Sequence, residues 1–125
     1  MKIYTSYYNN LKNIPIGFDP IGVSLKTPLF ALKRIKTFEK LFPDENTFED
    51  YKGGVISEDD FRKEYELKLS KLNKKQIIRE LFDMSNGADI VLMCWEKKGF
   101  CHRHLIAKWL SIGGFKVEEL WFGIN

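Results

Sequence analysis

The chain has 125 residues, of which 44% are hydrophobic and 30% charged, a balance typical of a single globular domain. The formal net charge is +3, from 20 basic and 17 acidic residues, and so small an excess does not by itself indicate a nucleic-acid-binding protein. The sequence shows no signal peptide and no apolar run near the ~20 residues of a membrane span. Two cysteines do not make a disulfide framework, so we expect a cytoplasmic protein with reduced thiols, no membrane association and one domain over residues 1–125.

Segments with strand patterns alternate with segments with helix patterns along the chain. Strands are predicted at 1–8, 21–25, 88–94 and 115–122 from β-branched, aromatic and apolar residues. Helices are predicted at 31–41, 58–72, 74–85 and 102–112 from helical spacing and capping residues. Residues 42–56 are expected to form a loop with room for one short helix.

This alternation predicts an α/β fold: a single small three-layer sandwich, in which helices flank a mostly parallel sheet of about four strands. Residues 88–94 are almost all apolar, which is typical of a central strand buried on both faces. No internal repeat divides the chain.

Both cysteines and both histidines lie within residues 94–104, in one strand–loop–helix unit. In open parallel sheets, ligands bind beyond the carboxyl ends of the strands, where Cys94 and Glu96 are expected. Arg103 falls in the first turn of the next helix, where free backbone N–H groups and the helix dipole attract anions. This arrangement predicts a pocket for a small anionic ligand, lined by Cys94, with Arg103 holding a phosphate or carboxylate through two parallel hydrogen bonds. The loop contains only Gly99 and is therefore neither a Walker loop nor a dinucleotide-binding fingerprint.

The candidate catalytic groups of this unit are Glu96, Cys101 and His102. Cys101 would stand at the start of a helix beside His102 and Arg103, surroundings that favour a thiolate nucleophile. Glu96 or His102 would transfer protons. The alternatives are that Cys101 packs as a small apolar residue and that Glu96 forms an ion pair with Arg103 or His102.

Other strand ends are expected at the same edge of the sheet. Thr5, Ser6 and Tyr7 close the first strand, and Ser24 and Lys26 close the second. Their hydroxyl and ammonium groups would complete the binding site for the anion. Alternatively, these groups form hydrogen bonds that only cap the loops.

No metal site is predicted. The two cysteines and two histidines are potential zinc ligands, but their spacing differs from that of zinc fingers, ribbons and knuckles. Adjacent residues such as Cys101 and His102 point in different directions on a helix, which makes joint ligation awkward. The sequence identifies no cofactor.

The sequence resembles family 488 of the domains of unknown function over nearly the whole chain. The resemblance rests on Ile-Tyr-Thr-Ser-Tyr-Tyr at 3–8, on Leu-Met-Cys-Trp-Glu-Lys at 92–97 and on the segment 101–110, which begins Cys-His-Arg-His. Similar members are short stand-alone proteins of bacteria and phages. The resemblance implies a compact α/β fold with the shared residues gathered at one end of the sheet, and no settled activity. For this chain it implies a site at Cys94, Glu96, Cys101, His102 and Arg103.

The sequence leaves several functions open. The first is an enzyme or binding protein for a small phosphate- or nucleotide-containing ligand, with hydrolase activity as one option. The second is a nucleic-acid-binding or processing protein, in which basic residues within 33–40 and 68–75 would contact phosphates. The third is a phage or host interaction protein without catalysis, for which Trp121 and Phe122 would form a docking patch. The sequence does not determine the substrate or the oligomeric state.

Overall fold

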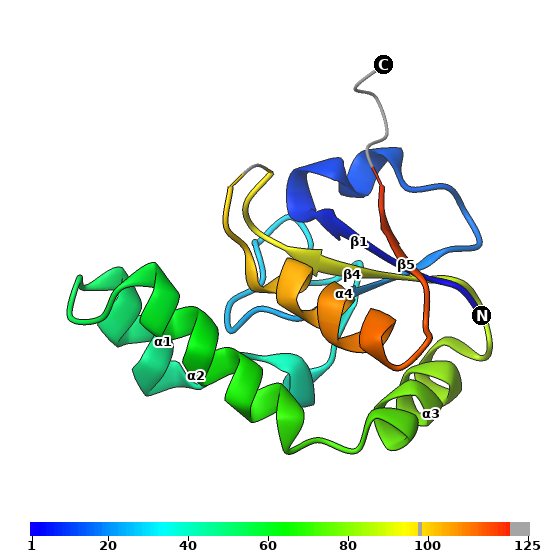
Figure 1. Ribbon diagram of the computed structural model, residues 1–125. Helices are drawn as coiled ribbons and strands as arrows, with labels where there is room; N and C mark the ends of the chain where they lie inside the picture. Colours follow the sequence, from blue (N-terminus) through cyan, green and yellow to red (C-terminus); the bar gives the residue numbers. More distant parts are fainter. Residues whose placement is uncertain (98, 121–125) are drawn as a thin grey trace.

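The structure, a computed structural model, describes residues 1–97 and 99–120 (Figure 1). Within these residues, five parallel strands form one sheet in the order β3-β2-β4-β1-β5. The strands are β1 (Ile3–Tyr7), β2 (Asp19–Gly22), β3 (Lys36–Thr37), β4 (Ile90–Cys94) and β5 (Val117–Glu119). The prediction of an α/β fold with a mostly parallel sheet is confirmed, with five strands in place of about four.

The α-helices of the described residues are α1 (Glu45–Lys52), α2 (Glu58–Ser70), α3 (Lys74–Ser85) and α4 (His102–Ile112). Two short 3-10 helices, η1 (Tyr8–Asn13) and η2 (Glu39–Leu41), follow β1 and β3. The side-chain oxygens of Ser57 and Asn73 accept hydrogen bonds from backbone N–H groups in the first turns of α2 and α3, as their capping positions predict. No helix of the described residues is long and apolar enough to cross a membrane.

The two faces of the sheet are covered differently. On one face α4 packs against β1, β4 and β5, and α2 packs against α4 (Figure 1). On the other face η1 and the turn at 29–34 take the place of α-helices, because Tyr8, Leu11 and Ala31 pack there against residues of β4. The sandwich therefore has α-helices in one outer layer and a 3-10 helix with turns in the other.

The strand β4 is the centre of the sheet, between β1 and β2, and all five of its residues are buried. Ile90 and Leu92 belong to the larger hydrophobic core beneath the α-helices. Val91 and Met93 belong to the smaller core on the opposite face. Alternate side chains of a strand point to opposite faces, so the unbroken apolar run is explained by a strand covered on both sides.

The predicted helix at 31–41 is wrong. The backbone N–H groups of Ala31 and Leu32 donate to the Pro28 carbonyl in a turn, and Lys36–Thr37 then pairs with β2 as strand β3. Pairing with a neighbouring strand overrides the helical spacing of a short segment. Another difference concerns an element end, since β2 covers 19–22 in place of 21–25. The segment 42–56 contains α1, the one short helix for which the sequence left room.

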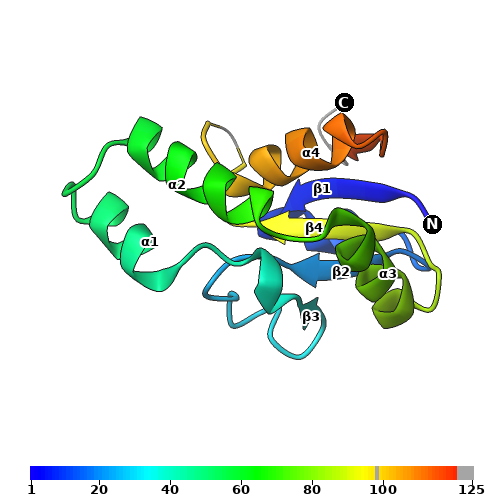
Figure 2. The same ribbon diagram turned by 60° about the horizontal axis from the view of Figure 1, so that its bottom comes forward.

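The arrangement brings several elements together at one edge of the sheet. Because the strands are parallel, the carboxyl ends of β1, β2 and β4 meet at this edge, with Tyr7 paired to Cys94 and Gly22 to Met93. Figure 2 shows α1 and the first turns of α2 beyond the tips of these strands. The proposed docking patch of Trp121 and Phe122 lies outside the described residues.

Candidate functional site

A cavity of about 320 Å³ opens at the carboxyl ends of β2 and β4. Its aromatic wall consists of Phe48 and Tyr51 from α1, Phe61 from α2, and Trp95 and Phe100 from the loop between β4 and α4. The rings of Tyr51 and Phe61 stack with centroids 4.9 Å apart, and the Phe100 ring stands edge-on 5.7 Å from that of Phe61. A cavity of this size with flat apolar walls suits a small ligand that contains a planar ring.

The polar groups that line the cavity come from the loops after β2 and β4, from the end of α1 and from the start of α4. They are Ser24, Lys26, Lys52, Glu96 and His102. Lys52 Nζ lies 3.6 Å from Glu96 Oε1, and both side chains are about half exposed, at 53% and 42%. Glu96 therefore pairs with Lys52 and not with Arg103 or His102, the partners expected from the sequence.

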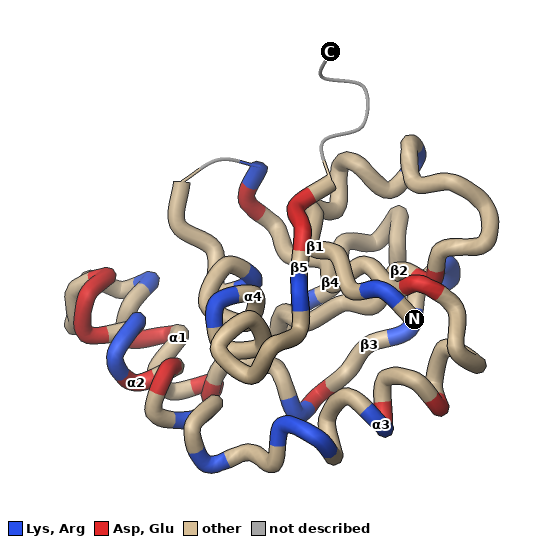
Figure 3. Tube along the Cα trace, turned by 45° about the vertical axis from the view of Figure 1, so that its right-hand side comes forward, with Lys and Arg blue, Asp and Glu red and all other residues tan. Residues whose placement is uncertain are grey.

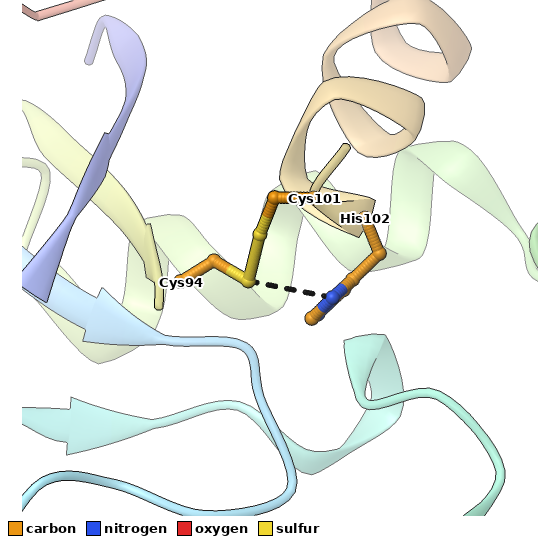
Figure 4. Close-up of side chains that lie close together, drawn as sticks. All are labelled: Cys94, Cys101 and His102. Atoms are coloured by element: carbon orange, nitrogen blue, oxygen red, sulfur yellow. Dashed lines mark hydrogen bonds between the residues drawn. A yellow bond between two sulfur atoms is a disulfide. The ribbon is translucent and has the colours of Figure 1, made fainter. Parts of the chain in front are cut away.

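The floor of the cavity contains a disulfide bond between Cys94 and Cys101 (Figure 4). The prediction of reduced thiols is therefore wrong for this structure, and Cys101 is not a free nucleophile in it. The cause is local geometry: Cys94 ends β4 and Cys101 is the N-cap residue of α4, and the short loop between them returns the chain until their Cα atoms are 6.9 Å apart. Each cysteine is only 3% exposed.

His102 lies beside this disulfide and is 5% exposed. Its Nε2 is 2.6 Å from the Val23 carbonyl oxygen, which can only accept, so Nε2 carries the proton and Nδ1 presents a lone pair. Burial lowers the pKa of this imidazole from 6.5 to about 4; the hydrogen bond to Val23 opposes the shift, and the charges of Arg103 and Lys68 add to it. His102 is therefore neutral at pH 7.

The sulfur atoms of Cys94 and Cys101 and a ring nitrogen of His102 all lie within 4.8 Å of one another. The expectation that Cys101 and His102 point in different directions is wrong. Cys101 has extended backbone angles, φ −146° and ψ 139°, so the side-chain directions of a regular helix do not apply to it. Thiolates and imidazole are zinc ligands, so these residues could hold a metal ion once the disulfide is reduced.

Arg103 is completely buried and does not line the cavity. Its Nη2 donates to Glu119 Oε2 at 2.8 Å and its Nε to Glu119 Oε1 at 3.2 Å, while Nη1 donates to the backbone carbonyl of Glu96. The prediction that Arg103 holds the anion of a ligand is corrected by this geometry, because its guanidinium group is already paired. Arg103 instead connects α4 to β5 and to the loop that carries Glu96.

The predicted residues at the end of β1 are likewise engaged elsewhere. Thr5 Oγ1 donates to Glu119 Oε1, and Ser6 Oγ donates to the Leu120 carbonyl at 3.0 Å. The ring of Tyr7 lies under Lys97 Nζ, 5.9 Å from the centroid. None of Thr5, Ser6 and Tyr7 is among the described residues that line the cavity.

Ser24, which was expected at the end of the second strand, lies in the loop after β2 and lines the cavity. Its hydroxyl donates to the Lys26 carbonyl at 2.7 Å and accepts from the Tyr8 hydroxyl at 2.6 Å. The Lys26 carbonyl also accepts a hydrogen bond of 2.8 Å from Trp95 Nε1. These bonds fix the loop after β2 against the loop after β4, so both loops form one continuous wall.

Sequence reasoning missed the residues that α1 and α2 contribute. Phe48, Tyr51 and Lys52 belong to the segment that was expected to be a loop with room for one short helix, and Phe61 was assigned only to the core. The signal available in the sequence was weak: aromatic residues three positions apart, after Pro43 and Asp44, in a segment with no binding motif.

The family model DUF488-N3a, described as the active DUF488-N3 subclade, matches residues 23–113 of the chain. Searches of curated proteins and of solved structures find no match. The matched segment includes every residue described above as lining the cavity, from Ser24 to His102.

Proposed function

We propose that this chain, which belongs to the DUF488-N3 subclade, binds a small anionic ligand that contains a phosphate or nucleotide group in the cavity at the carboxyl ends of β2 and β4. The observation that carries the proposal is the composition of the cavity wall: a cluster of aromatic rings with two lysines, Lys26 and Lys52, beside it. The position also agrees with the general location of ligand sites in open parallel sheets.

The aromatic rings provide the stacking surface for a planar base. Stacking of a base on an aromatic side chain contributes about 1–3 kcal/mol. Tyr51 and Phe61 already stack on one another, and Trp95 and Phe100 stand beside the same space. A nucleoside or another flat ring therefore gains more from this cavity than a flexible polar molecule does.

The lysines provide the charge for the anionic group. Lys52 is paired with Glu96 at 3.6 Å, but exposed ion pairs of this kind contribute only about 0–1 kcal/mol. A phosphate of the ligand can therefore replace the carboxylate of Glu96 as the partner of Lys52. Glu96, once released, is the candidate proton-transfer group for hydrolysis of the bound ligand.

The nucleic-acid alternative has less support from the distribution of charge. Three of the eight basic residues on which it depends form ion pairs: Lys36 with Asp19, Lys40 with Glu80, and Lys68 with Asp44. Figure 3 shows acidic and basic residues interspersed along α1 and α2. Paired charges give less of the counterion release that drives binding to a phosphate backbone.

The proposal is tested by thermal shift with a nucleoside, the corresponding nucleotide and inorganic phosphate as separate probes. A nucleotide at about 100 times its Kd would stabilise the protein by about 2.7 kcal/mol, which raises the Tm by roughly 10 °C for a domain of this size. We expect Tyr51→Ala to weaken binding of nucleoside and nucleotide, and Lys52→Ala to weaken binding of nucleotide and phosphate.

The matched control is Lys33→Ala, which removes an exposed lysine of the turn at 29–34, outside the cavity. This variant should bind every probe as the wild type does. Equal binding in the Tyr51, Lys52 and Lys33 variants, or no shift with any nucleotide or sugar phosphate in a protein that melts cooperatively, would refute the proposal. Hydrolysis is tested in the same samples by measuring whether the nucleotide is converted to products during long incubations.

A further inference from the structure

The disulfide between Cys94 and Cys101 lies where small molecules can reach it. Both residues line the cavity, although each is nearly buried with respect to bulk solvent. Exchange between thiols and disulfides requires that an incoming sulfur atom approach one sulfur of the bond directly. A small thiol can make this approach through the cavity, whereas a cysteine on the surface of a large protein cannot.

The contact between Cys94 and His102 suits the reduced form of the cysteine pair better than the oxidised form. Cys94 Sγ lies 3.4 Å from His102 Nδ1 (Figure 4), and Nδ1 carries a lone pair because Nε2 donates to Val23. A disulfide sulfur has no proton, so it cannot donate to this lone pair. A reduced Cys94 has a thiol proton, and Nδ1 is placed to accept it. The buried acceptor therefore matches the reduced state of the pair.

Cys101 has a different environment, which suits a leaving group. It is the N-cap residue of α4, a helix of 11 residues, and its side chain makes no capping hydrogen bond. The free N–H groups and the dipole at the start of a helix stabilise a thiolate. The two reduced sulfur atoms are thus stabilised differently. Cys94 has a hydrogen-bond acceptor for its thiol proton, and Cys101 has a helix N-terminus that stabilises its thiolate.

From this geometry we propose that Cys94 and Cys101 are a redox-active pair that exchanges with small thiols and disulfides in the cavity, with Cys101 as the leaving group of the reduction and His102 as the hydrogen-bond acceptor of reduced Cys94. The inference deepens the proposed function, since it assigns chemistry to the floor of the same cavity. It requires entry of a small thiol but not recognition of a nucleotide.

The exchange balances as follows for reduction by a low-molecular-weight thiol. The thiolate attacks Cys94 Sγ, a new S–S bond forms, the bond to Cys101 breaks, and Cys101 leaves with the electron pair and then takes up a proton. A second thiolate attacks the small-molecule sulfur of the mixed disulfide and releases a small disulfide. Cys94 leaves as a thiolate, takes up a proton and donates it in a hydrogen bond to His102 Nδ1. Two thiols are oxidised, and the protein gains two electrons and two protons.

The oxidising direction reverses these steps. Cys94 attacks a small disulfide as a thiolate, and one small thiolate leaves and takes up the proton that Cys94 released. Cys101 then loses its proton and attacks Cys94 Sγ in the mixed disulfide, which restores the bond between the cysteines and releases the second small thiolate, which takes up that proton. Cys94 and Cys101 are therefore the reacting residues, and His102 is a positioning residue that accepts a hydrogen bond from reduced Cys94.

The first measurement is a redox titration of the full chain in mixtures of reduced and oxidised glutathione. Samples are quenched with acid and alkylated, and the number of alkylated cysteines is determined by mass spectrometry. We expect one transition between a form with no alkylated cysteine and a form with both alkylated, while circular dichroism shows that the protein stays folded. A pair that stays oxidised in excess reduced glutathione, or reduced in excess oxidised glutathione, would overturn the proposal.

The second measurement tests the contact between Cys94 and His102. Because Nδ1 accepts the thiol proton of reduced Cys94, this contact stabilises the reduced pair and has no equivalent in the disulfide. His102→Phe removes the acceptor, so the midpoint of the titration should move toward mixtures with a several-fold larger proportion of reduced glutathione. The matched control is His104→Phe, at an exposed position of the same helix, which should leave the midpoint unchanged. An unchanged midpoint in a folded His102→Phe protein would contradict the role of this contact.

The outcomes also separate this inference from the proposed function. Exchange with glutathione that persists when no nucleotide binds would refute only the proposed ligand. Nucleotide binding in a protein whose disulfide does not exchange would refute only the redox pair. The reduced protein is also incubated with zinc and dialysed: stoichiometric zinc that is lost in Cys94→Ser and that blocks exchange would make the cluster a metal site and overturn the redox assignment.

Discussion

Replacement of Arg103 distinguishes a ligand-binding arginine from one that holds the fold together. The side chain is 0% exposed and donates two hydrogen bonds to the carboxylate of Glu119, whose own side chain is 15% exposed. Arg103→Met removes the cation and leaves this carboxylate almost buried without it. Breaking a buried ion pair by removing one partner costs about 3–5 kcal/mol.

We take the lower end of this range, because Thr5 still donates a hydrogen bond to Glu119 and a small part of the carboxylate reaches solvent. A loss of about 3 kcal/mol with a urea m value of roughly 2 kcal/mol/M lowers the unfolding midpoint by about 1.5 M. Urea unfolding followed by circular dichroism measures this change directly. The control Arg79→Met, at an exposed position of α3, should change stability by no more than about 0.5 kcal/mol.

The pair itself is tested by combining Arg103→Met with Glu119→Gln. The amide keeps an acceptor for Thr5 but carries no charge, so the double variant should be more stable than Arg103→Met by about 1–2 kcal/mol. An Arg103→Met protein with an unchanged urea midpoint and abolished nucleotide binding would refute this reasoning. In that event the arginine would act on the ligand, as its position at a helix start predicts from the sequence.

Other predictions concern proton uptake, packing and a helix end. Burial holds the pKa of His102 near 4, below its ordinary 6.5, so the unfolded chain takes up the proton first and up to about 3 kcal/mol of stability is lost as pH falls from 6.5 to 4. His102→Gln should lack this part of the acid dependence in urea unfolding, and an identical pH profile would contradict it. A Cβ at Gly22 would lie 2.9 Å from the Tyr8 hydroxyl oxygen, so Gly22→Ala should cost about 1–3 kcal/mol; an unchanged Tm would show that the site relaxes. Asn86 ends α3 with a positive φ of 54°, so Asn86→Val should cost about 1–2 kcal/mol while Asn86→Gly costs nothing, and equal melting of the two variants would contradict this.

The parts of the fold that local patterns determine were predictable from the sequence. The apolar run of β4 and the capping residues of α2 and α3 each identify one element without reference to the rest of the chain. The segment at 31–41 was not predictable in this way. Its residues have helical spacing, but Lys36–Thr37 gains backbone hydrogen bonds from β2 that no short-range pattern encodes.

The candidate site likewise has parts that the sequence could predict and parts that it could not. Four of the predicted site residues, Cys94, Glu96, Cys101 and His102, line the cavity at the carboxyl end of β4. The role of Arg103 could not be derived, because its partner Glu119 lies 16 positions later in the chain, on strand β5. The aromatic wall could not be derived either, because α1 reaches the cavity only through its packing on α2.

The family match covers the residues that line the cavity but not all of the residues that hold Arg103 in place. The matched residues, 23–113, contain the disulfide and every described residue that lines the cavity. The match does not include β1 or β5, which contribute the hydroxyl of Thr5 and the carboxylate of Glu119 to the network around Arg103. Substitutions in the first group should therefore change binding or exchange at nearly constant stability when the side chain is half exposed, as for Lys52. Substitutions in the second group should change the urea midpoint first, and should affect the cavity only through the loop whose carbonyl Arg103 holds.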